Sequence, residues 1–230
     1  MITLTSGPWP PFTGEDLDHF GLAEKTVSDA FEREGYAVVF SFRPWMRAFV
    51  EAKAGRARGS ILWRWTKARE KTFYFSDPVI MVDIVFFHLK SNRFDWKTLD
   101  DLHRLRIGVV NGFKYEDAFD AAVASGGLAA GAVASQEINF KKVLKGRIDI
   151  TPVVLESGYA TLNRLFTPET AALFTHHVRP LARHNLYLIL SRKIKENSRV
   201  MADFNRGLRR LDSPAGKDAT VLPDLGQAVP

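Results

Sequence analysis

The sequence predicts an α/β fold of two similar lobes, and three observations support it. Residues 2–63 show strand and helix patterns in the order β-α-β-α-β, which is typical of a parallel open sheet with crossover helices. The alternation restarts after Trp96. Gly55-Arg56 and Gly146-Arg147 each lie between a helix and a strand, which indicates a weak internal repeat. We therefore expect lobe one to comprise 1–86 plus 190–230, and lobe two to comprise 87–189.

Hydrophobic periodicity gives the elements of the first lobe. The expected elements are a strand at 2–5, a helix at 22–34, a strand at 37–42, a helix reaching Lys53 and a strand at 59–63. One face of the first helix is apolar and contains Ala23, Val27, Ala30 and Phe31. Gly35 follows this helix as a C-cap. We expect Ser76-Asp77-Pro78 to stop the aromatic strand at 72–75.

The second lobe shows a similar alternation. The expected elements are helices at 99–105, 115–125, 135–145 and 156–166 and strands at 106–110 and 148–154. Gly126, Gly127 and Gly131 predict a loose turn. The extended segment at 81–89 is long enough to pass between the lobes. A strand at 186–191 and a helix at 198–211 return to lobe one, and the weak periodicity after Asp212 predicts a partly disordered tail.

Composition excludes several classes of protein. With 46% hydrophobic and 25% charged residues among 230, the chain is an ordinary globular protein. The net charge of +6 does not form a basic run with interleaved aromatics, and residues 1–89 hold equal numbers of basic and acidic side chains. We therefore expect no nucleic-acid partner. The absence of cysteine excludes disulfides, thiolate metal sites and cysteine catalysis.

The start of the chain leaves two alternatives for its compartment. Met1-Ile2-Thr3-Leu4 is not followed by a basic segment and an apolar core. Either the protein has no signal peptide, or a mature form begins at a new start methionine. No run of apolar residues is long enough to cross a membrane.

The segment from Trp63 to Pro78 is the strongest candidate for a binding site. Trp63 ends the strand at 59–63, and Arg64, Trp65, Thr66 and Arg69 follow it within a short stretch. The planar guanidinium of arginine can donate two parallel hydrogen bonds to a carboxylate, and aromatic walls can exclude water from such a site. The alternative is a strand end and a solvated turn, with the tryptophans in the core.

Several motifs together resemble a known family. They are Trp9-Pro10-Pro11-Phe12, the helix at 21–35, Gly55-Arg56, Thr66-x-x-Arg69 with Phe75-Ser76-Asp77-Pro78, Ile107-Gly108-Val109-Val110-x-Gly112, and Gly146-Arg147-Ile148-Asp149. In this order they resemble the periplasmic solute-binding proteins of amino-acid-type ABC transporters (bacterial extracellular solute-binding protein family 3). The resemblance covers nearly the whole chain. It implies two Rossmann-like α/β lobes joined by a two-strand hinge, the type II periplasmic-binding fold, with a ligand cleft between the lobes.

The resemblance also implies roles for individual residues. Arg69 falls where the family binds the ligand's carboxylate, with Thr66 and Arg64 as added donors. Trp9 falls at an aromatic position against the ligand, and Leu62, Trp45 and Trp65 are expected to line the site. Gly112 and Phe113 fall at the helix start of lobe two, whose free N–H groups can bind a carboxylate. The implied partners are a small-molecule ligand and a membrane permease. We expect a periplasmic monomer with its signal peptide removed.

The chain departs from the family pattern at two positions that bear on the ligand. The acid that takes an α-ammonium in the family maps to Val153 or Val154 here, and the nearest acid is Glu156. Arg64 replaces a small hydroxyl residue, so an ammonium beside it would be costly to bury. A carboxylate-bearing or dianionic ligand fits Arg64 and Arg69 better than a plain amino acid. The alternative is that Arg64 pairs with a local acid such as Glu70.

Two other functions are compatible with the sequence. An enzyme of the dehydratase or lyase type could use Glu156 as a general acid or base, although an acid at a helix N-terminus is also stabilised by the helix dipole. An extracytoplasmic sensor domain is a further alternative. The six histidines show no metal-ligand spacing, and no nucleotide-binding or hydrolase motif occurs. We therefore expect no catalytic residue, no cofactor and no metal.

Overall fold

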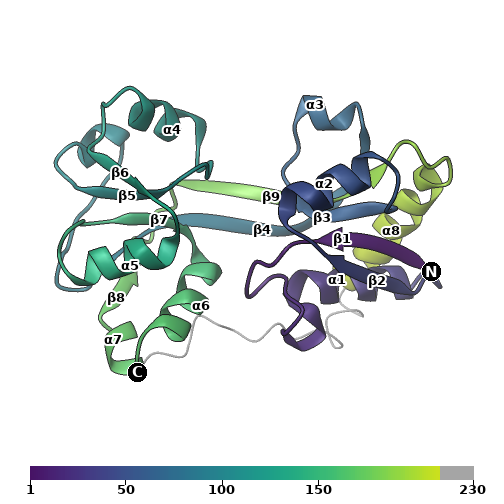
Figure 1. Cartoon of the computed structure of the whole chain (residues 1–230), viewed down its shortest axis with the longest axis horizontal. Helices are drawn as coiled ribbons and strands as arrows, with labels where there is room; N and C mark the ends of the chain where they lie inside the picture. Colours follow the sequence, from purple (N-terminus) through teal and green to yellow (C-terminus); the bar gives the residue numbers. More distant parts are fainter. Residues whose placement is uncertain (213–230) are drawn as a thin grey trace. The chain divides into compact units, whose positions relative to one another are not determined.

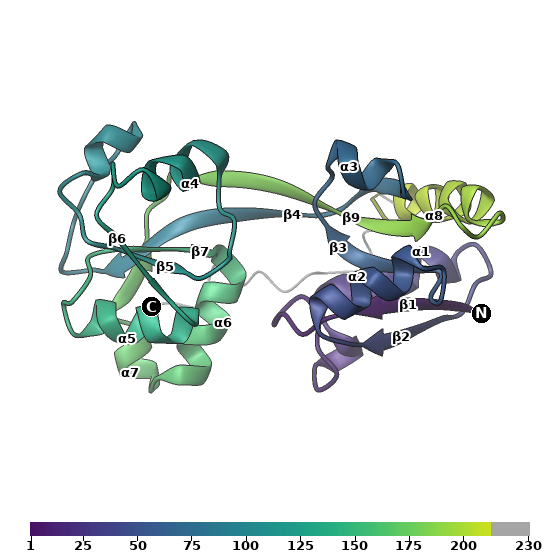
Figure 2. The ribbon, with the colours of Figure 1, turned by 45° about the horizontal axis from the view of Figure 1, so that its top comes forward.

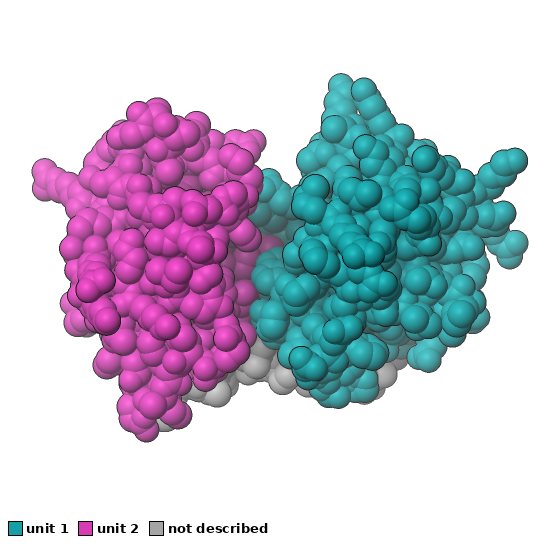
Figure 3. Space-filling view, in the orientation of Figure 1, with its two compact units in different colours: residues 1–81, 184–227 teal, residues 82–183, 228–230 magenta. Residues whose placement is uncertain are grey.

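The computed structural model describes residues 1–212, which fall into two compact units (Figure 3). Among these residues, unit 1 contains 1–81 and 184–212, and unit 2 contains Val82–Arg183. The chain passes from one unit to the other inside strand β4 and returns inside strand β9. The lobes expected at 1–86 plus 190–230 and at 87–189 stay a prediction. The disorder expected after Asp212 lies outside the described residues.

Unit 1 is built on a sheet of parallel strands with helices between them (Figure 1). Its elements are β1 (Ile2–Ser6), the 3-10 helix η1 (Asp18–Phe20), α1 (Leu22–Glu32), β2 (Val38–Phe42), α2 (Trp45–Lys53), β3 (Gly59–Trp63), α3 (Lys67–Glu70), the first half of β4 (Phe73–Leu89), most of β9 (Ala182–Ser191) and α8 (Asn197–Asp212). Strand β1 pairs in parallel with both β2 and β3, and β9 pairs antiparallel with β3. This order confirms the β-α-β-α-β pattern predicted for the first lobe.

The topology of unit 1 creates a switch point at β1. Helix α1 leads from β1 to β2 on one side, and α2 leads from β2 across β1 to β3 on the other side (Figure 2). Because the three strands are parallel, their carboxyl ends lie at one edge of the sheet. Ligands bind at such an edge in open α/β sheets, beside the switch point. A ligand site is therefore expected in the loops that follow β1, β2 and β3.

Helices α1 and α8 pack closely in the core of unit 1. The face predicted to be apolar is confirmed, since Ala23, Val27, Ala30 and Phe31 are all fully buried. Phe31 meets Phe204 of α8 with ring centroids 4.7 Å apart. Gly207 permits this approach, because a Cβ at that position would collide with the backbone oxygen of Ala30. Close-packed interiors tolerate no such overlap.

Unit 2 repeats the α/β theme with its own core. Its elements are η2 (Leu99–Leu102), β5 (Ile107–Val110), α4 (Asp117–Ala124), β6 (Ala130–Val133), α5 (Gln136–Leu144), β7 (Thr151–Val154), α6 (Leu155–Leu165), α7 (Pro168–Ala171) and β8 (Phe174–His176), with the second half of β4. Strand β5 pairs in parallel with β6, and β4 pairs antiparallel with β7 and β8. The buried side chains that fill the core include Phe87, Phe140, Leu162 and Phe174.

Two sequence expectations about strands are wrong. Strand β4 runs without interruption from Phe73 to Leu89, so Ser76-Asp77-Pro78 does not stop it. Pro78 is exposed, and the N–H of Asp77 is satisfied by the Asn205 side chain of α8, so neither residue needs a neighbouring strand at this point. The expected loose turn includes Gly131, which instead lies within β6 and pairs with Gly108. Among the described residues, no helix has the length and apolar character needed to span a membrane.

Candidate functional site

The carboxyl edge of the unit 1 sheet carries most of the predicted site residues. Trp9 lies in the loop after β1, Trp45 begins α2 after β2, and the segment from Arg64 to Arg69 follows β3. Segments far apart in the sequence meet there because parallel strands end at a common edge. The hydrogen bond from Trp45 Nε1 to the Pro8 carbonyl, 3.4 Å, links the first two loops directly.

Three aromatic rings pack together at this edge. We call the group the aromatic shelf, and its members are Trp45, Phe49 and Trp63. Ring centroids of Trp63 lie 5.7 Å from Trp45 and 4.9 Å from Phe49. Gly7 sits beside the shelf, and a Cβ there would come within 2.6 Å of the Trp45 indole. The absence of a side chain at Gly7 therefore permits Trp45 to lie in this position.

The Arg69 guanidinium lies over this shelf. Its central carbon is 5.0 Å from the centroid of Trp63 and 5.6 Å from that of Phe49. Its Nη1 donates a 2.8 Å hydrogen bond to the carbonyl of Arg64, which fixes the side chain at one end. Burial and, to a smaller extent, the charge of Arg64 lower the pKa of Arg69 from its usual value. No acid pairs with Arg69 among residues 1–212. The guanidinium is thus a partly buried, oriented and uncompensated cation.

The backbone of strand β3 is irregular at its end, next to the aromatic shelf. Leu62 has φ 61°, in the left-handed region that a leucine rarely adopts, and the pairing of β3 with β9 shifts between Ser60 and Trp63. Trp63 Nε1 donates a 2.8 Å hydrogen bond to Ser60 Oγ, which holds the indole beneath the guanidinium. Such strained positions persist where surrounding contacts determine them, and they concentrate at functional sites. Leu62 itself is buried.

The remaining residues of this segment differ in their surroundings. Thr66 is the N-cap of α3, and its hydroxyl accepts a 3.2 Å hydrogen bond from the Arg69 N–H. Trp65 is 50% exposed and belongs to no ring contact of the described chain. Arg64 is partly buried, and within residues 1–212 its side chain forms no ion pair, including none with Glu70. The structure therefore brings Arg64, Thr66 and Arg69 together and leaves Trp65 at the surface.

Trp9 is held by its own loop. Its ring lies 4.8 Å from that of Phe12, and backbone hydrogen bonds join Trp9 and Thr13 in both directions. The Thr13 hydroxyl donates a 2.6 Å hydrogen bond to the Gly7 carbonyl and closes the loop. Trp9 is partly buried, and within the described chain its ring does not contact the aromatic shelf. The carbonyl of the neighbouring Pro8 connects this loop to Trp45 by accepting the hydrogen bond from its Nε1.

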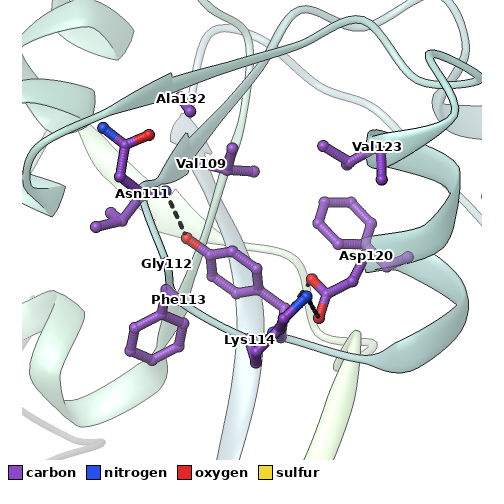
Figure 4. A pocket seen from close by; sticks show the side chains of 12 residues that line it. Val109, Asn111, Gly112, Phe113, Lys114, Asp120, Val123 and Ala132 are labelled. Carbon is purple, nitrogen blue, oxygen red and sulfur yellow. Dashed lines mark hydrogen bonds and ion pairs between the residues drawn. The ribbon is translucent and has the colours of Figure 1, made fainter.

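Gly112 and Phe113 lie in unit 2, in the turn after β5. The expectation that they start a helix is wrong, because α4 begins at Asp117 and the Glu116 carboxylate caps it by accepting from the Phe119 N–H. The Phe113 N–H is itself bonded to the Val110 carbonyl. A hollow of about 210 Å³ lies beside this turn (Figure 4). Ligand pockets are usually larger, about 300 Å³ or more, so the hollow alone does not define a site.

Glu156 lies at the first turn of α6, directly after β7. Its Oε2 is buried and has no hydrogen-bond partner among the described residues. Burial, with a smaller contribution from Asp83, raises the pKa of Glu156. An unpartnered carboxyl with a raised pKa can take or give a proton, which is the property that an acid-base group needs.

Two features of the site were not predicted from the sequence. One is the pair of rings beneath Arg69, since no sequence pattern points to Phe49 and the sequence is equally consistent with Trp63 in the core. The other is Glu24, fully buried on α1, which accepts a 2.7 Å hydrogen bond from Ser6 Oγ at the end of β1. Burial raises the pKa of Glu24 to about 8. Its position was detectable, because residue 24 shares the apolar helix face with Val27 and Phe31.

Comparisons with known proteins identify the fold. No family model matches the chain, and no curated protein matches it. Among solved structures, it is similar to a substrate-binding domain assigned to an amino acid ABC transporter from Streptococcus pneumoniae, with 16% identity, TM-score 0.72 and coverage of 95% of this chain and 96% of that one. A histidine kinase sensor domain similar to periplasmic binding proteins matches with 16% identity and TM-score 0.69, over 95% and 93% of the two chains.

A third solved structure is an ancestral amino acid-binding protein described as a precursor of cyclohexadienyl dehydratase. It matches with 17% identity and TM-score 0.65, over 94% of this chain and 92% of that one. At these identities the similarity establishes the fold and not the ligand. The two-lobed α/β fold class predicted from the sequence is confirmed. No group of three or more acidic or histidine side chains within residues 1–212 could hold a metal ion.

Proposed function

Because the chain has the type II fold of the periplasmic solute-binding proteins, we propose that it binds a small carboxylate-bearing solute. The observation that carries this proposal is the uncompensated Arg69 guanidinium on the aromatic shelf. A desolvated cation without an acidic partner is costly unless a ligand supplies the negative charge. Arginine is suited to that role, since its planar fork matches a carboxylate.

The position of Arg69 supports the same conclusion. It follows β3 at the carboxyl edge of a doubly wound sheet, where ligands of open α/β folds bind. In the proposal, Arg69 clamps the carboxylate, Thr66 and Arg64 add donors, and Trp9, Trp45, Trp65 and Leu62 form apolar surroundings. For unit 2, Gly112, Phe113 and Glu156 stay predictions from the sequence.

The biological role that we propose is delivery of the solute to the permease of an ABC transporter. The similarity to a transporter substrate-binding domain supports this role, and a periplasmic location and a monomeric state are part of it. Strands β4 and β9, which cross between the units, would serve as the hinge for closure. Genes for a permease and an ATPase next to the gene for this chain would support transport.

A thermal-shift screen with amino acids and small carboxylic acids tests the proposal. At least one carboxylate should raise the melting temperature, because a ligand that binds only the folded state stabilises it. Arg69→Ala should abolish that shift. Arg33→Ala, which removes an exposed arginine of the same unit, should leave it intact. No shift with any acid in a broad panel would contradict the proposal.

A second function is supported by one observation, the unpartnered buried Oε2 of Glu156. An enzyme on this fold could use Glu156 as a general acid or base, and one similar structure is described as a dehydratase precursor. Mass spectrometry of the bound solute after incubation distinguishes the two functions. A chemically changed solute with wild type, but an unchanged one with Glu156→Gln, would favour the enzyme.

A further inference from the structure

The site at the end of β3 carries two positive charges that the described chain does not neutralise. Arg69 Nη1 donates a 2.8 Å hydrogen bond to the Arg64 carbonyl, and the charge of Arg64 helps to lower the pKa of Arg69. Neither side chain forms an ion pair within residues 1–212, although arginines elsewhere in unit 1 do: Arg206 and Arg210 with Glu34, Arg209 with Asp77, and Arg47 with Glu51. Two like charges at a partly buried edge repel each other until an anion arrives.

The acids of unit 1 near this edge are ion-paired elsewhere, uncharged or exposed to solvent. Glu51 lies 2.9 Å from Arg47 and 3.8 Å from Arg43, so its charge is shared between them. Glu24 is buried against Ser6, and its pKa of about 8 leaves it mostly protonated at neutral pH. Glu70 is exposed and does not contribute to the pKa of Arg69. An ammonium group bound here would therefore lie beside two cations, neither of which is ion-paired with an acid of the described chain.

A ligand with two anionic groups would neutralise the positive charges of both Arg64 and Arg69. One carboxylate would bind the oriented fork of Arg69, and the second would neutralise Arg64. Each charge-assisted hydrogen bond contributes more than a neutral one. The aromatic shelf beside the pair supplies an apolar surface for the carbon skeleton between the two groups.

We propose that this site selects small dicarboxylates that lack an ammonium group, with Arg64 as the residue that determines the selectivity. The inference rests on the proposed solute-binding function and specifies its ligand class. It assigns different tasks to the two arginines. Arg69 should be needed for every carboxylate ligand, whereas Arg64 should be needed only for the second anionic group.

Matched ligands test the proposal by isothermal titration calorimetry of the full chain. Suitable sets are butanedioate with butanoate and α-aminobutanoate, pentanedioate with pentanoate and α-aminopentanoate, and phthalate with benzoate and phenylglycine. At least one dicarboxylate should bind about tenfold or more tightly than its monocarboxylate and its amino counterpart. Arg64→Ser should remove that preference while leaving monocarboxylate binding nearly unchanged. Arg33→Ala should keep the preference.

Three results would overturn the inference, and they are distinguishable. Binding of an amino acid as tight as that of the matched dicarboxylate would contradict the ligand class and leave the solute-binding function standing. A dicarboxylate preference that survives Arg64→Ser would contradict the role of Arg64. If no member of any set binds while the circular dichroism spectrum shows a folded protein, the inference is refuted. The solute-binding function is refuted with it only when the broad thermal-shift panel of acids also gives no shift.

Discussion

The Arg69 guanidinium lies over the indole of Trp63, with its central carbon 5.0 Å from the ring centroid. The residues are neighbours in the fold because β3 ends at Trp63 and the short helix α3 turns Arg69 back over it. A cation above an aromatic face is stabilised by about 0.5–2 kcal/mol, depending on its exposure. The contact therefore both orients Arg69 and partly offsets the cost of burying it.

Substitution of Trp63 tests this contact. Trp63→Phe should lower the free energy of unfolding by about 1 kcal/mol, because it removes the 2.8 Å hydrogen bond to Ser60 Oγ. It should also weaken ligand binding, since the smaller ring is a poorer platform for Arg69. Chemical denaturation and calorimetry measure the two effects. Trp65→Phe is the matched control, and it should leave stability unchanged because Trp65 is half exposed. Equal stability losses in both variants would contradict a stabilising role for the hydrogen bond between Trp63 and Ser60.

Glu24 should make stability depend on pH near neutrality. Its folded-state pKa, about 8, lies above the ordinary value of 4.5. The folded state therefore holds the proton more tightly than the unfolded state, and the stability contribution is full below about pH 4.5 and lost as pH rises toward 8. Glu24→Gln cannot ionise and should remove this decline. Urea denaturation at a series of pH values measures it, and an identical decline in the variant would show that another group causes it.

His176 should make stability depend on pH in the direction opposite to Glu24. Burial, with the nearby charges of His88 and His177, lowers the pKa of His176 from its ordinary value of 6.5. The unfolded state therefore binds the proton more readily, and stability should fall as pH drops below about 6.5. His176→Gln should flatten that fall. His103→Gln is the control, because His103 is exposed in the same unit. A fall in stability that His176→Gln leaves unaltered would contradict this origin.

The fold was predictable from sequence because its signals are local. The apolar face formed by Ala23, Val27, Ala30 and Phe31 follows helical periodicity, and all four side chains are buried. The error at Ser76-Asp77-Pro78 has a tertiary cause. A proline usually interrupts a strand, but here the Asp77 N–H bonds to Asn205, a residue far away in sequence.

The site was predictable in part for the same reason. The spacing of Thr66 and Arg69 is a local pattern, and the structure places both residues at the carboxyl edge of the sheet, with Thr66 capping α3. The aromatic surface beneath Arg69 includes Phe49, which belongs to a different helix, and no sequence pattern links the two residues. Likewise, the bond between Ser6 and Glu24 joins a strand to a helix and is visible only in the fold.

The most direct test of the central claim is the affinity of the Arg69→Ala variant for the strongest carboxylate ligand of wild type, measured by isothermal titration calorimetry. The variant should lose at least about tenfold in affinity, because a charge-assisted hydrogen bond contributes roughly 1.5–3 kcal/mol. Its unfolding free energy should stay close to that of wild type or rise, since Arg69 is an uncompensated, partly buried charge. An affinity equal to that of wild type in a folded Arg69→Ala variant would contradict the claim that Arg69 binds the carboxylate.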